Sequence, residues 1–383
     1  MKIYSYGKQD ISQEEIDAVV GVLNSDTLTQ GPKIKEFESA ICEYTGATYC
    51  VVLTNATAGL HLSMLALDVA AGDEVITTPT TFMASANCVG YAGGTVKFAD
   101  IDPETANISV CEIKRQITSK TKAIIPVHYA GQSCDMEAIH DLGQKHGFYI
   151  VEDAAHAIGS DYKNAKVGSC AHSDMTVFSF HPVKNITTGE GGAVTTNSRE
   201  LYERLLLLRS HGIVKNDSQL TCAHGKWHYE MHRPGFNYRM TELQAALGLS
   251  QLKRIGKFKE KRRHIVSLYE KLFSKDSRIS FLEERDYSNA CFHLWPALID
   301  FKNLKIDKKK FFDQLWKAGL HLQVHYVPVH WFSYYRNLGF SRGDFPKAEM
   351  YYEQTVSLPL YPSLSDDEVG YISKTFLMAL NNV

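Results

Sequence analysis

The segment FSFHPVKNITTGEGG, residues 178–192, guides the interpretation of the whole chain. It begins inside an apolar run at 175–180 that predicts a buried strand, and it then presents one lysine, Lys184, before a glycine-rich turn. A lysine beyond a buried strand is a candidate for Schiff-base chemistry, because desolvation lowers an amine pKa that is about 10.4 in water. The glycines permit close approach of backbone or of a bulky cofactor. A lysine alone is more often an ordinary surface residue, so other residues of the chain must indicate whether Lys184 forms a Schiff base.

Strands and helices alternate around this segment. Strands are predicted at 49–53, 74–78, 95–101, 123–127, 148–151, 175–180 and 193–196. Helices are predicted at 56–67, 80–91, 136–146 and 199–211. Such alternation predicts an α/β fold, with a mostly parallel sheet sandwiched by helices. Ligands of open sheets bind beyond the carboxyl ends of the strands, where residues 55–57, Asp153 and residues 179–184 are expected to meet.

The length of 383 residues predicts two domains. A long helix is expected over 241–273, and short strands and helices are mixed after it, with strands at 292–299 and 321–326. We therefore predict a large α/β domain over residues 1–250, which includes the N-terminal helices, and a smaller α+β domain over residues 251–383.

The composition is that of a soluble globular protein, with 44% hydrophobic and 22% charged residues. The net charge of −2 gives no basic surface for nucleic acid, and no apolar segment has the length of a membrane helix. The first residues show no signal peptide, so we expect a cytoplasmic protein. The eight cysteines contain no C-x-x-C pair, so they indicate neither a zinc site nor a disulfide framework.

Asp153 closes a hydrophobic strand and is therefore expected to be partly buried. A buried carboxylate needs a cation or strong donors, which a salt bridge or a helix cap would supply. The functional alternative is that Asp153 faces the protonated ring nitrogen of pyridoxal phosphate, which makes that ring an electron sink.

A phosphate site is predicted at residues 55–59, between a strand and a helix, because a helix N-terminus offers free N–H groups to an anion. Ala56 and Thr57 lie at this turn, although a plain helix cap is the alternative. Ser179 precedes Lys184 by five residues and adds a hydroxyl to the same site. Phe82 follows a strand end and either covers a flat cofactor ring or packs in the core.

Two other site types are disfavoured. His321, His325 and His330 lie in an apolar, strand-like segment without an acidic co-ligand in register, so we expect no metal there. The segment GEGG at 189–192 is not G-x-G-x-x-G and does not support a dinucleotide site.

Several motifs in order resemble those of the DegT/DnrJ sugar aminotransferases, which are fold-type-I pyridoxal-phosphate enzymes acting on nucleotide-linked keto sugars. They are EDAAH (152–156), Ser179, Lys184 with TGEGG (188–192), LTQGP (28–32), PVHYAG (126–131), HG (211–212), NYRM (237–240), HYVPVH (325–330) and SLPLYP (357–362). The resemblance extends over nearly the whole chain.

Within the family, SFHPVK followed by ITT (residues 179–184 and 186–188) is similar to the branch of the pseudaminic acid pathway. That branch moves the amino group of L-glutamate to C4 of a UDP-linked 4-keto-6-deoxy-N-acetylhexosamine. The product is UDP-4-amino-4,6-dideoxy-N-acetyl-β-L-altrosamine.

The resemblance implies a role for each matching residue. Lys184 would bind pyridoxal phosphate as a Schiff base and shuttle a proton, and Asp153 would keep the ring nitrogen protonated. The remaining implied cofactor contacts are Ala56 and Thr57 with Ser179 at the phosphate, Phe82 on the ring, His156 near the 3-hydroxyl, and Asn237 from a neighbouring subunit. The implied sugar contacts are Tyr6, Gln30, His325, Tyr326 and His330.

A contribution from Asn237 implies a homodimer with shared active sites. At position 56 the chain departs from the pattern, because many members of the family have glycine where this chain has Ala56. Backbone N–H groups do most of the binding at such a turn, so we expect alanine to be tolerated there.

Three rival interpretations stay open. A 3-dehydratase of the family has a histidine in place of the lysine, so Lys184 argues against it. A transaminase for another nucleotide-linked keto sugar is distinguished only weakly by these motifs. A non-catalytic binding or regulatory protein would lose Lys184 or Asp153, and both are present.

Overall fold

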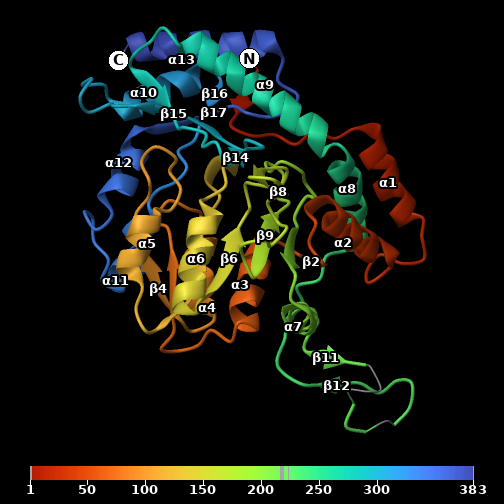
Figure 1. Cartoon of the computed structure of the whole chain (residues 1–383). Helices are drawn as coiled ribbons and strands as arrows, with labels where there is room; N and C mark the ends of the chain where they lie inside the picture. The colour runs from red at the N-terminus through yellow and green to blue at the C-terminus, as the bar shows by residue number, and fades with distance from the viewer. Residues whose placement is uncertain (1, 216–219, 223, 383) are drawn as a thin grey trace.

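A seven-stranded sheet forms the centre of the molecule (Figure 1). The computed structural model describes residues 2–215, 220–222 and 224–382. The strands of the sheet run in the spatial order β2 (Tyr49–Leu53), β10 (Gly192–Thr196), β9 (Met175–Ser179), β6 (Tyr149–Asp153), β5 (Thr121–Ile125), β3 (Glu74–Thr77) and β4 (Thr95–Phe98). The predicted α/β fold with a mostly parallel sheet is confirmed.

Strand β10 is the exception, because it pairs antiparallel with both β2 and β9. The alternation of elements does not reveal this direction. Residues 180–191 join β9 to β10 without a helix. Antiparallel neighbours can be joined by a short turn, whereas parallel neighbours need a crossover connection, so this link sets the direction of β10.

Helices cover both faces of the sheet. One face packs on α3 (Ala56–Ala66), α4 (Ala84–Tyr91) and α7 (Arg199–Arg209). The other face packs on α2 (Pro32–Thr45), α5 (Val110–Gln116), α6 (Met136–His146) and α8 (Glu242–Lys253). In β2, Val51 and Leu53 join the first core while Cys50 and Val52 join the second, as the two-residue period of a strand requires.

The C-terminal part has its own hydrophobic cluster. A three-stranded antiparallel sheet in the order β13 (Ile279–Phe281), β15 (Trp295–Ile299) and β17 (Thr355–Leu358) packs on α9 (Ile255–Phe273), α10 (Lys308–Lys317) and α13 (Asp366–Asn381). Strand β1 (Tyr4–Ser5) pairs in parallel with β16 (Leu320–His321), so the start of the chain lies against this part. The boundary at residue 250 stays a prediction.

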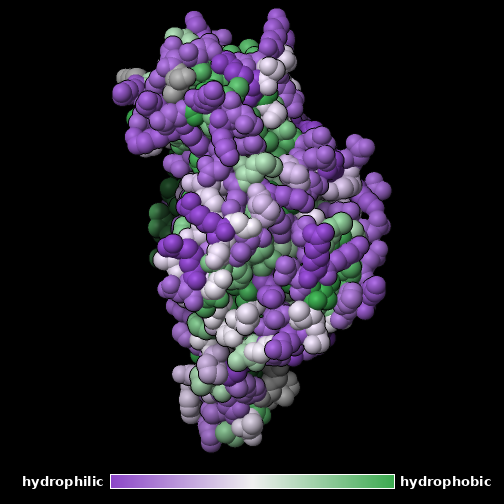
Figure 2. All heavy atoms as spheres, turned by 90° about the vertical axis from the view of Figure 1, so that its left-hand side faces the viewer, coloured by the Kyte–Doolittle hydropathy of each residue, from purple (hydrophilic) through white to green (hydrophobic). Residues whose placement is uncertain are grey.

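The remaining elements are short. They are α1 (Gln13–Leu23), α11 (Ser333–Asn337), α12 (Pro346–Gln354), the sheet of β14 (Ser288–Asn289), β7 (Asp161–Tyr162) and β8 (Ala165–Lys166), the hairpin of β11 (Ile213–Val214) and β12 (Glu230–Met231), and the 3₁₀ turns η1 (Tyr129–Gly131) and η3 (Val329–Trp331). Figure 2 shows the side that carries α11 and α12, where polar residues cover most of the surface. Among the described residues, no helix combines the length and hydrophobicity needed to span a membrane.

Two predicted elements differ from the structure. The stretch 241–273 forms two helices, α8 and α9, which meet at Arg254. The Arg254 Nη1 atom lies 2.9 Å from the buried Glu15 carboxylate, and this ion pair ties the corner to α1. The predicted strand 321–326 is reduced to β16, because beyond His321 only Gln323 makes a strand bridge, with Ser357.

Replacing Gly192 with alanine is expected to destabilise the protein by about 1–3 kcal/mol. A Cβ atom on Gly192 would lie 2.6 Å from the backbone nitrogen of Ala56, and backbone atoms have little freedom to move aside. Urea unfolding of the cofactor-free chain measures the loss. The matched control is Gly21→Ala in α1, where nothing lies within 4 Å and helix propensity favours alanine. Equal stability of the two variants would contradict the predicted contact.

Candidate active site

A cavity of about 470 Å³ lies at the carboxyl ends of β6 and β9, next to the start of α3. This is the place where ligands bind in open α/β sheets. The predicted site residues that line it are Tyr6, Ala56, Thr57, Phe82, Asp153, His156, Ser179, Lys184, His325 and Tyr326. The fold therefore gathers into one cavity residues that are spread over most of the chain.

Three predicted site residues lie elsewhere. Gln30 lines a separate cavity near Arg239. Asn237 is exposed, and its backbone bridges to Ser210. The His330 side chain is buried, with its Nε2 atom 2.9 Å from Glu349 Oε1. A role for Gln30, Asn237 or His330 stays a prediction.

The Lys184 amine lies in an environment that favours its neutral form. Burial lowers the pKa of Lys184 to about 8, although the negative charge of Asp153 acts in the opposite direction. The Nζ atom is 3.4 Å from Nε2 of His293, a buried residue. The lysine can therefore supply a nucleophilic amine near neutral pH.

The histidines around Lys184 are neutral. Burial, followed by the positive charge of Lys184, lowers the pKa values of His156 and His293 well below the usual range and that of His325 to about 3. The backbone N–H of Ala130 donates to His156 Nδ1 over 3.3 Å, so the proton of this imidazole lies on Nε2. That atom is 3.0 Å from the hydroxyl of Tyr326, which orients both rings.

The Asp153 carboxylate is held by two donors. Ser85 Oγ donates to Oδ2 over 2.6 Å, and the backbone N–H of Ala155 donates to Oδ1 over 3.0 Å. Each carboxylate oxygen accepts about two hydrogen bonds, so Asp153 retains acceptor capacity toward the cavity. The carboxylate is therefore a suitable hydrogen-bond acceptor for a protonated ring nitrogen.

The loop that carries Lys184 is anchored by the next residue. The side-chain amide of Asn185 donates to the carbonyl oxygens of Ile158 and Cys291 over 3.0 and 2.8 Å. Because Asn185 is buried, these bonds fix the backbone at Lys184 and so position its side chain. The loop thus holds the amine at the cavity instead of leaving it to sample solvent.

The sequence analysis missed Ser85, Asn185 and His293. The signal for His293 was available, since it is a lone polar residue in the apolar run CFHLW at 291–295. No local pattern marks Ser85, which reaches Asp153 from a position 68 residues earlier in the chain.

The other end of the cavity suits an anion. Helix α3 begins after Asn55, whose side chain accepts a hydrogen bond from Ala58 N over 2.8 Å, and Ala56 and Thr57 form its first turn. N–H groups in a first turn have no partner within the helix. Gly192 packs against the backbone of Asn55 and Ala56, so this glycine serves chain packing and not only space for a ligand.

Phe82 supplies an aromatic face at the cavity, with 54% of its surface exposed and its ring centroid 6.3 Å from that of Tyr326. An exposed aromatic side chain on the wall of a cavity is suited to cover a flat ring. An amine of lowered pKa, a carboxylate with spare acceptor capacity and a helix N-terminus match the aldehyde, ring nitrogen and phosphate of pyridoxal phosphate. Fold and cavity together therefore suit a protein that binds pyridoxal phosphate.

The chain belongs to the DegT/DnrJ/EryC1/StrS aminotransferase family, whose model matches residues 9–377. It is 40% identical over 361 residues to the spore coat polysaccharide biosynthesis protein SpsC of Bacillus subtilis, covering 94% of this chain and 92% of that protein. It is 38% identical over 382 residues to a UDP-4-amino-4,6-dideoxy-N-acetyl-beta-L-altrosamine transaminase of Campylobacter jejuni, covering 99% and 98%.

Among solved structures, the fold is similar to that of Helicobacter pylori PseC, an aminotransferase involved in the biosynthesis of pseudoaminic acid. The TM-score is 0.92 at 36% identity, and the match covers 100% of both chains. The similarity therefore includes the whole architecture and not only the central sheet.

The amine of Lys184 is expected to react with pyridoxal phosphate at a rate that rises with pH and levels off above about 8. At pH 7 a pKa of 8 leaves roughly one amine in ten neutral, against fewer than about one in a thousand for a lysine with a pKa of about 10.4. Visible absorbance of the cofactor-free chain follows the reaction. Borohydride reduction and mass spectrometry then identify the modified lysine, and Lys184→Ala is the control. A rate that still rises above pH 10 would contradict the lowered pKa.

Proposed function

We propose that this chain transfers the amino group of L-glutamate to C4 of a UDP-linked 4-keto-6-deoxy-N-acetylhexosamine. The product would be UDP-4-amino-4,6-dideoxy-N-acetyl-β-L-altrosamine, an intermediate of pseudaminic acid biosynthesis. The Campylobacter relative of that name matches 99% of the chain, which supports this choice of substrate. The observation that carries the chemistry is the Lys184 amine of lowered pKa, which shares one cavity with Asp153.

Lys184 is the central residue of the proposal. When bound, pyridoxal phosphate supplies an aldehyde for amines and an electron sink for negative charge at a substrate carbon. The Nζ atom of Lys184 takes the proton from Cα of L-glutamate while it is neutral, and it returns a proton to the sugar carbon in the second half of the reaction. A pKa of about 8 suits both directions of transfer, because near neutral pH part of the amine is neutral and accepts a proton, while the protonated amine gives one up readily.

The other residues hold and shield the cofactor. Asp153 keeps a proton on the ring nitrogen, and Ser85 holds its carboxylate in place. The backbone at Ala56, with the hydroxyls of Thr57 and Ser179, binds the phosphate. Phe82 would cover one face of the ring. His156, whose Nε2 atom is oriented by Tyr326, would lie near the 3-hydroxyl of the cofactor.

We further propose a homodimer in which Asn237 of the partner subunit reaches the phosphate. The exposure of Asn237 in a single chain supports this, since an exposed side chain is free to contact a second copy. The sugar nucleotide would lie between subunits and contact Tyr6, Gln30, His325, Tyr326 and His330. We place the reaction in the cytoplasm, which the eight free cysteines support.

A second candidate is an aminotransferase for a different nucleotide-linked keto sugar. The 40% identity to SpsC, which is named for spore coat polysaccharide biosynthesis, favours keeping it. Both candidates use the same cofactor residues and differ only in the sugar. A non-catalytic binding protein with this fold is the least favoured, because it would not need a lysine of lowered pKa.

A panel of nucleotide-linked 4-keto and 3-keto sugars, each incubated with L-glutamate, tests the substrate. We expect amination of the UDP-linked 4-keto-6-deoxy-N-acetylhexosamine at C4, with kcat/KM at least about tenfold above the other sugars, which corresponds to about 1.4 kcal/mol of discrimination. Mass spectrometry and NMR identify the product and its stereochemistry. Preferred turnover of another sugar would replace the proposed substrate while leaving the aminotransferase chemistry intact.

Two variants in the same assay separate failure of the substrate from failure of the mechanism. Lys184→Ala is expected to abolish turnover of every sugar. Asp153→Asn retains the shape of the side chain and is expected to bind the cofactor with activity lower by roughly 10²–10⁴-fold. Near-normal activity of either variant would remove that residue from the mechanism.

Hybrid dimers test the shared site. Mixing inactive Lys184→Ala chains with Asn237→Asp chains is expected to restore activity, because one site of each hybrid would combine an intact Lys184 with an intact Asn237 of the partner subunit. Each parental homodimer would carry a defect in both sites. The measurement is activity after co-refolding or co-expression of the two chains. Hybrids no more active than the parents, with Asn237→Asp itself impaired, would indicate that Asn237 acts within its own subunit.

A further inference from the structure

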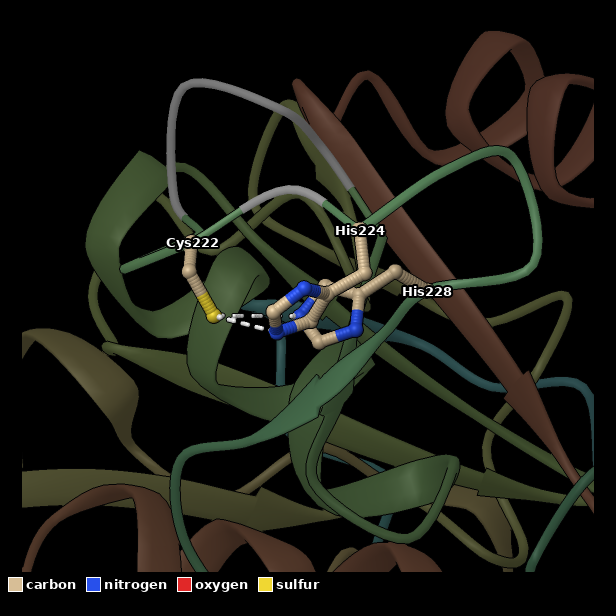
Figure 3. A group of neighbouring side chains, drawn as sticks. All are labelled: Cys222, His224 and His228. Atoms are coloured by element: carbon tan, nitrogen blue, oxygen red, sulfur yellow. Dashed lines mark hydrogen bonds between the residues drawn. The ribbon is translucent and has the colours of Figure 1, made fainter.

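The hairpin of β11 and β12 carries a group of metal-binding side chains that the aminotransferase chemistry does not use. It protrudes from the body of the molecule, away from the C-terminal elements (Figure 1). Within the described residues, the ligand atoms of Cys222, His224 and His228 all lie within 4.8 Å of one another. Figure 3 shows the thiol and the two imidazole rings converging on one point.

The spacing of these atoms is that of a zinc site. Cys222 Sγ lies 3.3 Å from His224 Nε2 and 3.7 Å from His228 Nε2. Zn–S bonds of about 2.3 Å and Zn–N bonds of about 2.0–2.1 Å in a tetrahedron place sulfur and nitrogen about 3.6 Å apart. The two rings are nearly perpendicular, at 87°, so they approach the thiol from different directions. The two sulfur–nitrogen distances therefore suit one ion bound by the thiol and both imidazoles.

Hydrogen bonding holds this group only weakly. A thiol is a weak donor and a weak acceptor, so its contacts with the two imidazole nitrogens that face it add little stability. A divalent cation accepts lone pairs from all three atoms at once. When zinc binds, it replaces the thiol proton, which is released to solvent.

Glu230 supports the group from the returning strand. Its Oε1 atom accepts hydrogen bonds from Thr221 N and Cys222 N over 2.9 and 3.2 Å, which holds the backbone at the thiol. The same atom lies 3.7 Å from Cys222 Sγ and 3.6 Å from His228 Nε2. Glu230 is therefore a positioning residue for the cysteine, and its carboxylate lies close to two of the three ligand atoms.

We propose that Cys222, His224 and His228 bind one Zn(II) ion that cross-links the hairpin. Thiolate and imidazole ligands select zinc over magnesium and calcium, which prefer oxygen. The spacing C-x-H-x₃-H contains no C-x-x-C pair, so the cysteine spacing alone gave no sign of it.

Few strand contacts hold the hairpin together, so a cross-link would stabilise it. Its strands are joined by two residue pairs, Ile213 with Met231 and Val214 with Glu230. In the single chain the side chains of Trp227 and Met231 are 77% and 63% exposed, so these two described residues do not form a core that could hold the loop. A zinc ion bound to Cys222 on one side and His228 on the other would fix the loop in place of such a core.

Zinc titration of the tag-free chain, after removal of metal with EDTA, tests the proposal. We expect one equivalent of zinc per chain in competition with a coloured chelator. Cobalt in place of zinc is expected to give a thiolate charge-transfer band that Cys222→Ser abolishes. A cobalt complex without that band, or zinc binding unchanged in Cys222→Ser, would overturn the proposal.

Matched controls distinguish this site from surface binding. Cys111→Ser and His146→Gln alter an exposed cysteine and an exposed histidine elsewhere, and both are expected to bind zinc as the unaltered chain does. Glu230→Gln is expected to weaken binding by about 10–100-fold, as loss of a residue that orients a ligand typically does. Cys222→Ser is expected to weaken it more. Equal weakening in Cys111→Ser and Cys222→Ser would overturn the proposal.

Limited trypsin digestion tests the cross-link without measuring binding or activity. Lys226 is exposed within the loop, between the proposed ligands. Zinc is expected to slow cleavage after Lys226 in the unaltered chain and to have no effect in Cys222→Ser. Cleavage at the same rate with and without zinc in the unaltered chain would contradict the cross-link.

Discussion

The parallel pairing of β6 with β9 is the constraint on which the cavity depends. Its register sets Asp153 opposite Val177, so both strands end at the same edge of the sheet. The carboxylate at the end of β6 and the loop that follows β9 therefore face one space. Asn185 then fixes that loop through the carbonyl oxygens of Ile158 and Cys291, which belong to distant parts of the chain. A slip of one residue in this pairing would turn Asp153 to the opposite face.

Desolvation is the main cause of the lowered pKa values in the cavity. Burial lowers the pKa of Lys184, and it also keeps His156, His293 and His325 neutral next to it. Charged imidazoles would lower the pKa of the amine further. Because the imidazoles are neutral, the negative charge of Asp153 is the one that opposes deprotonation of the amine. Burial and this one carboxylate together give the Lys184 amine a pKa at which it can both accept and donate a proton.

The hairpin of β11 and β12 differs from the core in how its side chains are buried. In the central sheet, residues on the two faces enter hydrophobic clusters, and burial stabilises the fold. The hairpin exposes Trp227 and Met231 instead, and its polar side chains converge around Cys222. With the proposed zinc ion, this protruding segment would be held by coordination and not by burial.

The sequence by itself determined the α/β class, because the periods of strands and helices depend on the local order of apolar residues. It also indicated Lys184, Asp153, Thr57 and Ser179 as site residues, since each lies at a strand end or a few residues beyond one, and such ends meet at one edge. The antiparallel direction of β10, the break between α8 and α9, and the contact of Ser85 with Asp153 needed the tertiary structure. Those features depend on which distant segments pack together, and burial of the Lys184 amine is likewise a property of the assembled fold.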